Sequence, residues 1–177
     1  MQTFVEKQKN TYTALKDEFG YTNTMQAPKI EKIVISSGIG KIQDPKKVEL
    51  IQDRLARITG QKTAPRGAKK SIAAFKVREG DVVGYQVTLR GEHMRDFFDK
   101  LIHVALPRTR DFRGLKPSAI DEIGNLTIGI KEHTIFPETS DEEQRNVFGF
   151  SATIVTTAKN KKEADAFLRY MGVPLKK

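Results

Sequence analysis

Residues 82–107 decide the fold, and they read VVGYQVTLRGEHMRDFFDKLIHVALP. In the first part every second residue is apolar or aromatic: Val83, Tyr85, Val87 and Leu89. This period of two predicts a β-strand over 82–89 with one buried face. From Gly91 the period becomes that of an α-helix, whose expected buried residues are Met94, Phe97, Phe98, Leu101, Ile102 and Ala105. Pro107, which has no backbone N–H, ends this helix.

The same two patterns predict three further helices and three further strands. The helices are expected at about 3–19, 45–59 and 161–171, and each is followed by a glycine suited to a left-handed C-cap: Gly20, Gly60 and Gly172. Asp44 and Asn160 are the expected N-caps of the second and third of these helices. The strands are expected at about 30–36, 126–130 and 148–156.

Strands joined by helices and by long turns predict an α+β fold, with an antiparallel or mixed sheet and helices packed on one side. Because the chain has 177 residues and neither an internal repeat nor an obvious linker, we expect one domain over 1–177. That arrangement leaves a sheet face and several loops free to bind a partner.

The composition favours a polyanionic partner. The chain has 31 Lys and Arg against 22 Asp and Glu, a net charge of +9, and a pI near 9.7. It has no cysteine, which excludes disulfides, thiolate zinc sites and cysteine nucleophiles and suits a reducing compartment. No apolar run approaches the roughly 20 residues that span a bilayer, and residues 1–10 lack the pattern of a signal peptide, so we expect a cytoplasmic protein with no membrane partner. A solvated basic surface is the alternative interpretation of the charge.

The strongest basic segment is 61–80. Its cations are Lys62, Arg66, Lys69, Lys70, Lys76 and Arg78, against the single acid Glu79. Several small residues accompany them, so the backbone of this predicted loop can approach phosphates closely. Phe75 stands between Lys70 and Lys76, where its ring either stacks on an RNA base or packs in the core. We weigh these two interpretations evenly for Phe75 and favour phosphate binding for the lysines.

A second basic segment, 107–116, carries Arg108, Arg110, Arg113 and Lys116. The planar guanidinium group can donate two hydrogen bonds to one phosphate. Asp111 is the single acid of the segment, and it could instead pair with one arginine to hold the turn. We expect one structural and two RNA-facing arginines.

The segment 136–146 has the opposite sign. Its acids are Glu138, Asp141, Glu142 and Glu143, against Arg145. RNA would repel this segment, so it is either a solvated loop or a contact for a basic protein.

We find no catalytic, metal-binding or cofactor-binding pattern. The histidines, His93, His103 and His133, lack ligand spacing, and Gly38-Ile-Gly40 lacks the rest of a nucleotide-binding motif. We therefore expect a non-enzymatic RNA-binding protein without a cofactor. A small nucleic-acid-modifying enzyme and a general chaperone-like RNA binder are the rival hypotheses.

Seven segments carry a family likeness: 69–80 (KKSIAAFKVREG), 87–92 (VTLRGE), 105–114 (ALPRTRDFRG), 124–125 (GN), 129–132 (GIKE), 135–138 (IFPE) and 156–159 (TTAK). They resemble, in this order, the bacterial L-five family of large-subunit ribosomal proteins. The likeness extends from about Tyr12 to the end of the chain, so it is far more specific than any single motif.

The resemblance implies an RRM-like ribosomal protein fold, an antiparallel sheet backed by helices. It implies binding to 5S rRNA in the central protuberance, with large-subunit rRNA and other central-protuberance ribosomal proteins as further partners. The residues that we assign to rRNA binding are Ser36, Ser37, Gly38, Gly40, Lys62, Arg66, Arg90, Arg108, Arg110 and Arg113.

Two further contacts are implied by the same resemblance. A loop at about 66–80 would reach the peptidyl-site tRNA, through Lys69, Lys70, Ser71, Phe75, Lys76 and Arg78. An acidic segment at about 137–148 would bridge to the basic S-thirteen protein of the small subunit, through Glu138, Asp141, Glu142 and Glu143.

The chain departs from the family pattern at three places. Ser36-Ser37 replaces the usual Asn-Met, which puts a side-chain contact by that asparagine in doubt. Ala74 stands where glycine is usual and stiffens the predicted tRNA-facing loop. The segment 121–124 (DEIG) lacks a positive charge that is common there.

Overall fold

The computed structural model describes residues 3–40, 42, 44–139 and 147–176. The α-helices of this part of the chain are α1 (Phe4–Phe19), α2 (Pro45–Thr59), α3 (Gly91–Lys100) and α4 (Lys161–Met171). Its strands are β1 (Ile30–Gly38), β2 (Ala64–Gly67), β3 (Val82–Leu89), β4 (Leu126–Ile130) and β5 (Phe150–Thr156). None of the helices within these ranges has the length and apolar character that a bilayer crossing requires.

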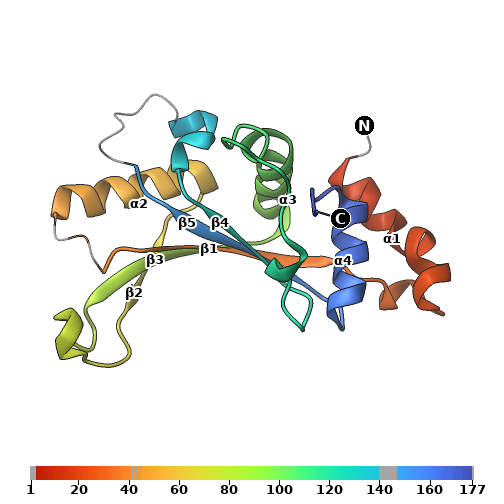
Figure 1. The fold of residues 1–177 in the computed structure, drawn as a ribbon, viewed down its shortest axis with the longest axis horizontal. Coiled ribbons are helices and arrows are strands. Elements are labelled where there is room, and N and C mark those ends of the chain that lie inside the picture. The colour runs from red at the N-terminus through yellow and green to blue at the C-terminus, as the bar shows by residue number, and fades with distance from the viewer. Residues whose placement is uncertain (1–2, 41, 43, 140–146, 177) are drawn as a thin grey trace. The chain divides into compact units, whose positions relative to one another are not determined.

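The five strands form one antiparallel sheet in the order β2-β3-β1-β5-β4 (Figure 1). In the β2–β3 pair, Ala64 lies opposite Gln86 and Arg66 opposite Gly84. Hydrogen bonds join β1 and β5 near both ends of the pair. Thr157 N donates to Lys29 O at one end, and Ser37 Oγ donates to Gly149 O at the other. The sheet and its helices confirm the predicted α+β class.

The predicted helix ends are confirmed by their caps. Thr3 and Glu6 form a reciprocal capping box at the start of α1, and the Asp44 side chain accepts a hydrogen bond from Lys46 N at the start of α2. The three glycines that follow α1, α2 and α4 have φ of +66°, +67° and +100°, a region that side-chain-bearing residues rarely adopt. Each of these helices therefore ends where the sequence indicates.

The segment after α3 differs from a simple helix. Leu101–Ala105 is one π-helical turn, in which Leu106 N donates to Leu101 O. The wider turn lets both Ala105 and Leu106 lie in the core, where they are 0% and 3% exposed. The predicted buried face, from Met94 to Ala105, is confirmed.

The packing divides the chain into two compact units. Unit 1 comprises 1–33, 90–128 and 153–177, and unit 2 comprises 34–89 and 129–152. In unit 1, α1 and α4 lie side by side, and Lys7 Nζ of α1 donates to Met171 O of α4 (Figure 1). Phe4 meets Phe98 edge to face, with 5.2 Å between the ring centroids.

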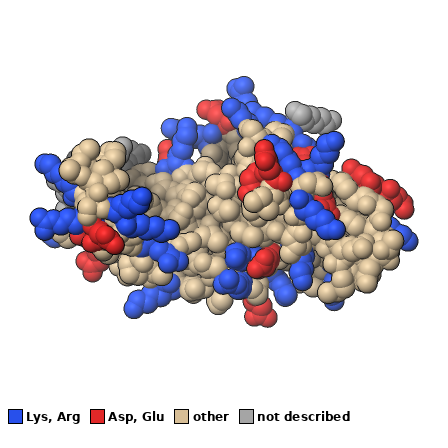
Figure 2. Space-filling view, turned by 90° about the horizontal axis from the view of Figure 1, so that it is seen from below, with Lys and Arg blue, Asp and Glu red and all other residues tan. Residues whose placement is uncertain are grey.

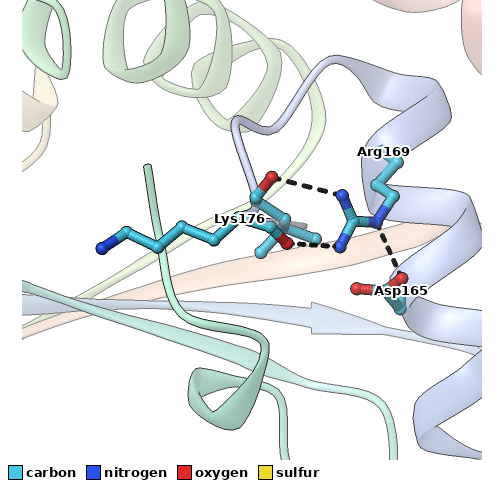
Figure 3. Close-up of polar contacts among 4 residues, drawn as sticks. Asp165, Arg169 and Lys176 are labelled. Carbon is cyan, nitrogen blue, oxygen red and sulfur yellow. Dashed lines mark hydrogen bonds and ion pairs between the residues drawn. The ribbon is translucent and has the colours of Figure 1, made fainter. Parts of the chain in front are cut away.

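Polar contacts fasten the C-terminal helix of unit 1. The Tyr21 hydroxyl donates to the carboxylate of Glu163, and burial together with that carboxylate raises the pKa of Tyr21 above its usual range. At the other end of α4, Arg169 Nε donates to Asp165, while its two terminal nitrogens donate to Leu175 O and Lys176 O (Figure 3). Arg169 thereby holds the C-terminal segment against α4.

The core of unit 2 is built from α2 and from aromatic residues around η5 (His133–Ile135). Ile51, Leu55 and Ile58 of α2 are at most 1% exposed. Phe136 packs on Phe150, with 5.8 Å between the ring centroids.

Candidate nucleic-acid interface

The basic segment 61–80 is not the plain loop that the sequence predicts, because β2 pairs with β3 and makes it a hairpin. A bulge lies between Arg66 and Gly67, and beyond it Ala68 N donates to Asp81 O. The pairing continues to Ile72 and Val77, which exchange hydrogen bonds of 2.9 and 3.3 Å. The hairpin is therefore ordered by its own backbone as far as the tip.

The tip is one turn of 3-10 helix, η2 (Ala73–Phe75). Lys76, which follows it, has a left-handed φ of +52°. The Ser71 hydroxyl accepts a hydrogen bond from Glu79 N, and the Asp81 carboxylate accepts one from Arg78 N. Ser71, for which we expect a tRNA contact, is exposed, and its hydroxyl also helps to close the hairpin.

The hairpin presents cations and apolar groups to solvent together. Lys69, Lys70, Lys76 and Arg78 are exposed, and none forms an ion pair with any residue in the described ranges. Phe75 is 71% exposed and Ile72 is 47% exposed, so the placement of Phe75 in the core is wrong. Figure 2 shows Lys and Arg side chains around the hairpin, at the left of the view.

Arg66 of β2 is exposed, like the other residues of this strand. Its Nε donates to Gln86 Oε1 at 2.5 Å, so the side chain is held across the strand pair. Lys62, just before β2, is also exposed. Two of the cations assigned to rRNA are thus available on unit 2.

The end of β1 places its residues on two different faces. Ser36 is exposed and lies 2.9 Å from Ser151 Oγ of β5, measured between the hydroxyl oxygens. Ser37 is 4% exposed, and its hydroxyl donates to Gly149 O at 2.9 Å. The expected RNA contact by the Ser37 side chain therefore needs correction, because successive strand residues point to opposite faces and Ser37 points inward.

Gly38 and Gly40 are exposed, and a Cβ built on either would meet no atom within 4 Å. Neither has the positive φ that favours glycine. Packing within the described chain and backbone conformation thus give no reason for glycine here.

The remaining arginines assigned to rRNA belong to unit 1. Arg90 is exposed at the N-cap position of α3, where its side chain makes no cap. Arg108, Arg110 and Arg113 are exposed, and across the described residues none is paired with Asp111. The expected structural arginine is therefore wrong.

At Leu115 the segment is held to the C-terminal residues by backbone hydrogen bonds. Leu115 N donates to Pro174 O at 2.8 Å, and Lys176 N donates to Leu115 O at 2.8 Å. Among the described residues, this backbone pairing involves none of the three guanidinium groups of the segment.

The acidic segment lies partly outside the described residues, which do not include Asp141, Glu142 and Glu143. Glu138, in η6 (Pro137–Thr139), is exposed. His133 precedes the acidic segment and Phe148 follows it, and the two residues are in contact. Their rings stack with centroids 4.2 Å apart, and Phe148 N donates to His133 Nδ1 at 3.3 Å. The position of this contact could not be predicted from sequence, because nothing in the local pattern links residues 15 apart.

His133 is a structural residue. It is 0% exposed, and burial holds its pKa below the usual range, with the positive charge of Arg54 acting in the same direction. Throughout the described ranges, His, Asp and Glu side chains form no cluster that could hold a metal ion.

Comparison with known proteins gives one family over most of the chain. Two family models match it: the one described as Ribosomal protein L5 matches residues 23–78, and the one for the C-terminus of the same ribosomal family matches residues 82–175. A protein named Large ribosomal subunit protein uL5 from Desulfotalea psychrophila is 53% identical over 93% of this chain and 92% of its own length.

Proteins of the same name from Flavobacterium johnsoniae and Rubrobacter xylanophilus are 47% and 51% identical. These matches cover 97% and 92% of this chain, and 94% and 91% of the relatives. The chain therefore belongs to the ribosomal protein L5 family, whose members are structural and non-enzymatic proteins.

Proposed function

We propose that this protein binds 5S rRNA in the central protuberance of the large ribosomal subunit and contacts the peptidyl-site tRNA through the β2–β3 hairpin. Its family makes it a structural constituent of the large subunit, and its place is the ribosome, which in bacteria is cytoplasmic. Ribosomal RNA and other ribosomal proteins are accordingly its partners.

The observation that carries the proposal is the hairpin with four exposed cations, unpaired among the described residues, beside an exposed ring. Each phosphate that a cation neutralises releases condensed counterions, which favours binding. The Phe75 ring offers a flat apolar surface to an unstacked base or a sugar. Because these cations do not serve the packing of the hairpin itself, they suit a polyanionic partner.

The 5S rRNA contacts are proposed for two sets of residues, one on each unit. On unit 2 these are Ser36, Gly38, Gly40, Lys62 and Arg66, with Ser37 contributing backbone only. On unit 1 they are Arg90, Arg108, Arg110 and Arg113. The serine and cationic side chains named, Ser37 excepted, are exposed, and the arginines can each bind phosphate in a bidentate manner.

A contact with the basic S-thirteen protein of the small subunit is proposed for Glu138, Asp141, Glu142 and Glu143. The acid excess of this segment in a chain of net charge +9 supports it. Opposite charges across such a contact would favour association and fix its orientation.

The test is a filter-binding comparison of the full chain with 5S rRNA and with an unrelated structured RNA of equal length. We expect at least about tenfold tighter binding of 5S rRNA, which corresponds to about 1.4 kcal/mol. We also expect the affinity to fall steeply between about 50 and 200 mM salt, because the contacts are mainly to phosphates. Equal affinity for the two RNAs would leave only a general RNA binder, and turnover of either RNA would revive an enzymatic role.

A further inference from the structure

Unit 1 contains a hollow of about 280 Å³ that the function proposed above does not use. Residues of α1, of the segment 24–29 that includes η1 (Thr24–Gln26), and of α3 line it. Ligand pockets in proteins commonly measure roughly 300–1,000 Å³, so this hollow suits a single flat group and not a large molecule.

The wall of the hollow offers apolar surface. Tyr12 and Pro28 contribute to it, and so does Met25, which is 82% exposed. Such an exposed methionine, with a flexible and polarizable side chain, adapts readily to an aromatic group.

The rim of the hollow is cationic. Lys9, Lys29 and Arg95 line it and are exposed, and no Asp or Glu is among the lining residues. None of the three cations forms an ion pair within the ranges that the structure describes. Lys16, which is not a lining residue, has its Nζ 5.6 Å from the centre of the Tyr12 ring. An anionic ligand is therefore favoured.

We propose that this hollow binds one unpaired nucleotide of large-subunit RNA. The base lies against Tyr12 and Met25, and Lys9, Lys29 and Arg95 bind the adjoining phosphates. Base stacking on an aromatic side chain combined with cations along the backbone is the usual way in which proteins hold single-stranded RNA. An acidic peptide would satisfy the cations but would not use the ring.

The inference rests on the proposed function only in taking ribosomal RNA as the surrounding partner. Its residues are not those of the β2–β3 hairpin, and they all belong to unit 1. The two can therefore be tested separately.

The local readout is a Met25→Trp variant, because the natural chain has no tryptophan. We expect hexauridylate and hexaadenylate to quench its fluorescence as a base stacks in the hollow, whereas hexaglutamate of similar charge does not. If hexaglutamate quenches the fluorescence as strongly as the RNA oligonucleotides do, the ligand is an acidic peptide and the proposal of an RNA ligand is wrong. No change with any of the three probes would overturn the site.

The charge test uses the same Met25→Trp protein. Lys29→Glu with Arg95→Glu should raise the RNA concentration for half-maximal quenching by about tenfold or more, since two phosphate contacts are reversed in charge. The matched control is Lys161→Glu with Lys162→Glu, two exposed lysines at the start of α4 in the same unit, with a change of under about threefold expected. Equal losses in the two variants would overturn the site, because long-range charge alone would then explain them.

Binding of 5S rRNA by the same proteins separates the two proposals. If the unsubstituted chain prefers 5S rRNA but shows no quenching as Met25→Trp, the hollow is not a nucleotide site while the proposed function stands. If quenching occurs as expected but 5S rRNA is not preferred, the site stands and the proposed function fails.

Discussion

Gly84 of β3 lies directly against the carbonyl oxygen of Ser37 of β1: a Cβ added at Gly84 would be 2.9 Å from that oxygen. The contact is backbone to backbone, so neither partner can turn away as a flexible side chain would. It fixes β3 close to the end of the strand that carries Ser36 and Gly38.

Gly84→Ala is therefore expected to lower the free energy of unfolding. Overpacking in a well-packed region costs about 1–3 kcal/mol, and here β1 or β3 must shift to relieve it. Urea unfolding followed by circular dichroism measures the change. An unfolding free energy equal to that of the unsubstituted chain would show that the strands have room to separate at this point.

Gly38→Ala makes the matched comparison, because a Cβ at Gly38 meets no atom within 4 Å and its φ is not positive. Stability should be unchanged, or higher by roughly 0.4–1 kcal/mol through the less flexible unfolded chain. Affinity for 5S rRNA should fall, since the added methyl group stands between the backbone and the proposed partner. A variant that is stable and binds 5S rRNA normally would remove Gly38 from the proposed interface.

The sequence predicts the elements of the sheet well where apolar residues alternate, as in 82–89. It does not predict β2, because four residues that include Pro65 and Gly67 have low strand propensity and are recruited by pairing with β3. Pro65 is tolerated there because β2 is an edge strand, where a missing N–H costs little.

For the candidate site, the distribution of charge along the sequence identifies the segment that forms the hairpin. It does not identify which residues of that segment stabilise the hairpin. Lys69 and Ser71 look equally available in the sequence, yet the Ser71 hydroxyl is used by Glu79 N. The alternation of strand faces could have shown that Ser37 is buried and Ser36 exposed, since Ile33 and Ile35 point to the same side as Ser37. The hollow beside Tyr12 is brought together by packing of α1, η1 and α3, which no local pattern shows.

Replacing Lys69, Lys70 and Lys76 by alanine is expected to weaken tRNA binding at the peptidyl site while sparing 5S rRNA binding. The three side chains are exposed and unpaired among the described residues, so their loss should leave folding unchanged. The decrease should be about tenfold or more at low salt, since up to three phosphate contacts disappear. Filter binding of tRNA to ribosomes reconstituted with the variant measures it.

The control removes the same charge elsewhere, by replacing Lys159, Lys161 and Lys162, which are also exposed, with alanine. A similar loss of tRNA binding in this control, or a joint loss of tRNA and 5S rRNA binding in the hairpin variant, would place the tRNA contact elsewhere.

Replacing Glu138, Asp141, Glu142 and Glu143 by their amides is expected to weaken association of the ribosomal subunits. The change removes four negative charges facing the proposed basic partner, and it should act most strongly where magnesium is low and RNA bridges are weakened. Sucrose-gradient sedimentation at graded magnesium concentrations measures the fraction of joined subunits. Gradients that match those of unsubstituted ribosomes at every magnesium concentration would rule out this contact.

His133 is expected to make the stability of the chain depend on pH. Because burial lowers the pKa of His133 in the folded state, the unfolded chain binds a proton more readily than the folded one. The free energy of unfolding should therefore be highest at pH values above the pKa of histidine in the unfolded chain, about 6.5. It should decrease as the pH falls below that value. Urea unfolding at several pH values between about 5 and 8 measures this slope.

The slope of stability against pH should be shallower in His133→Phe, which cannot take up a proton. That variant keeps a ring to stack on Phe148, although it loses the acceptor for Phe148 N, so its lower stability at all pH values is separate from the change in slope. His93→Gln, at an exposed position of α3, should keep the slope of the unsubstituted chain. If His133→Phe keeps that slope as well, the proton uptake on unfolding belongs to another group.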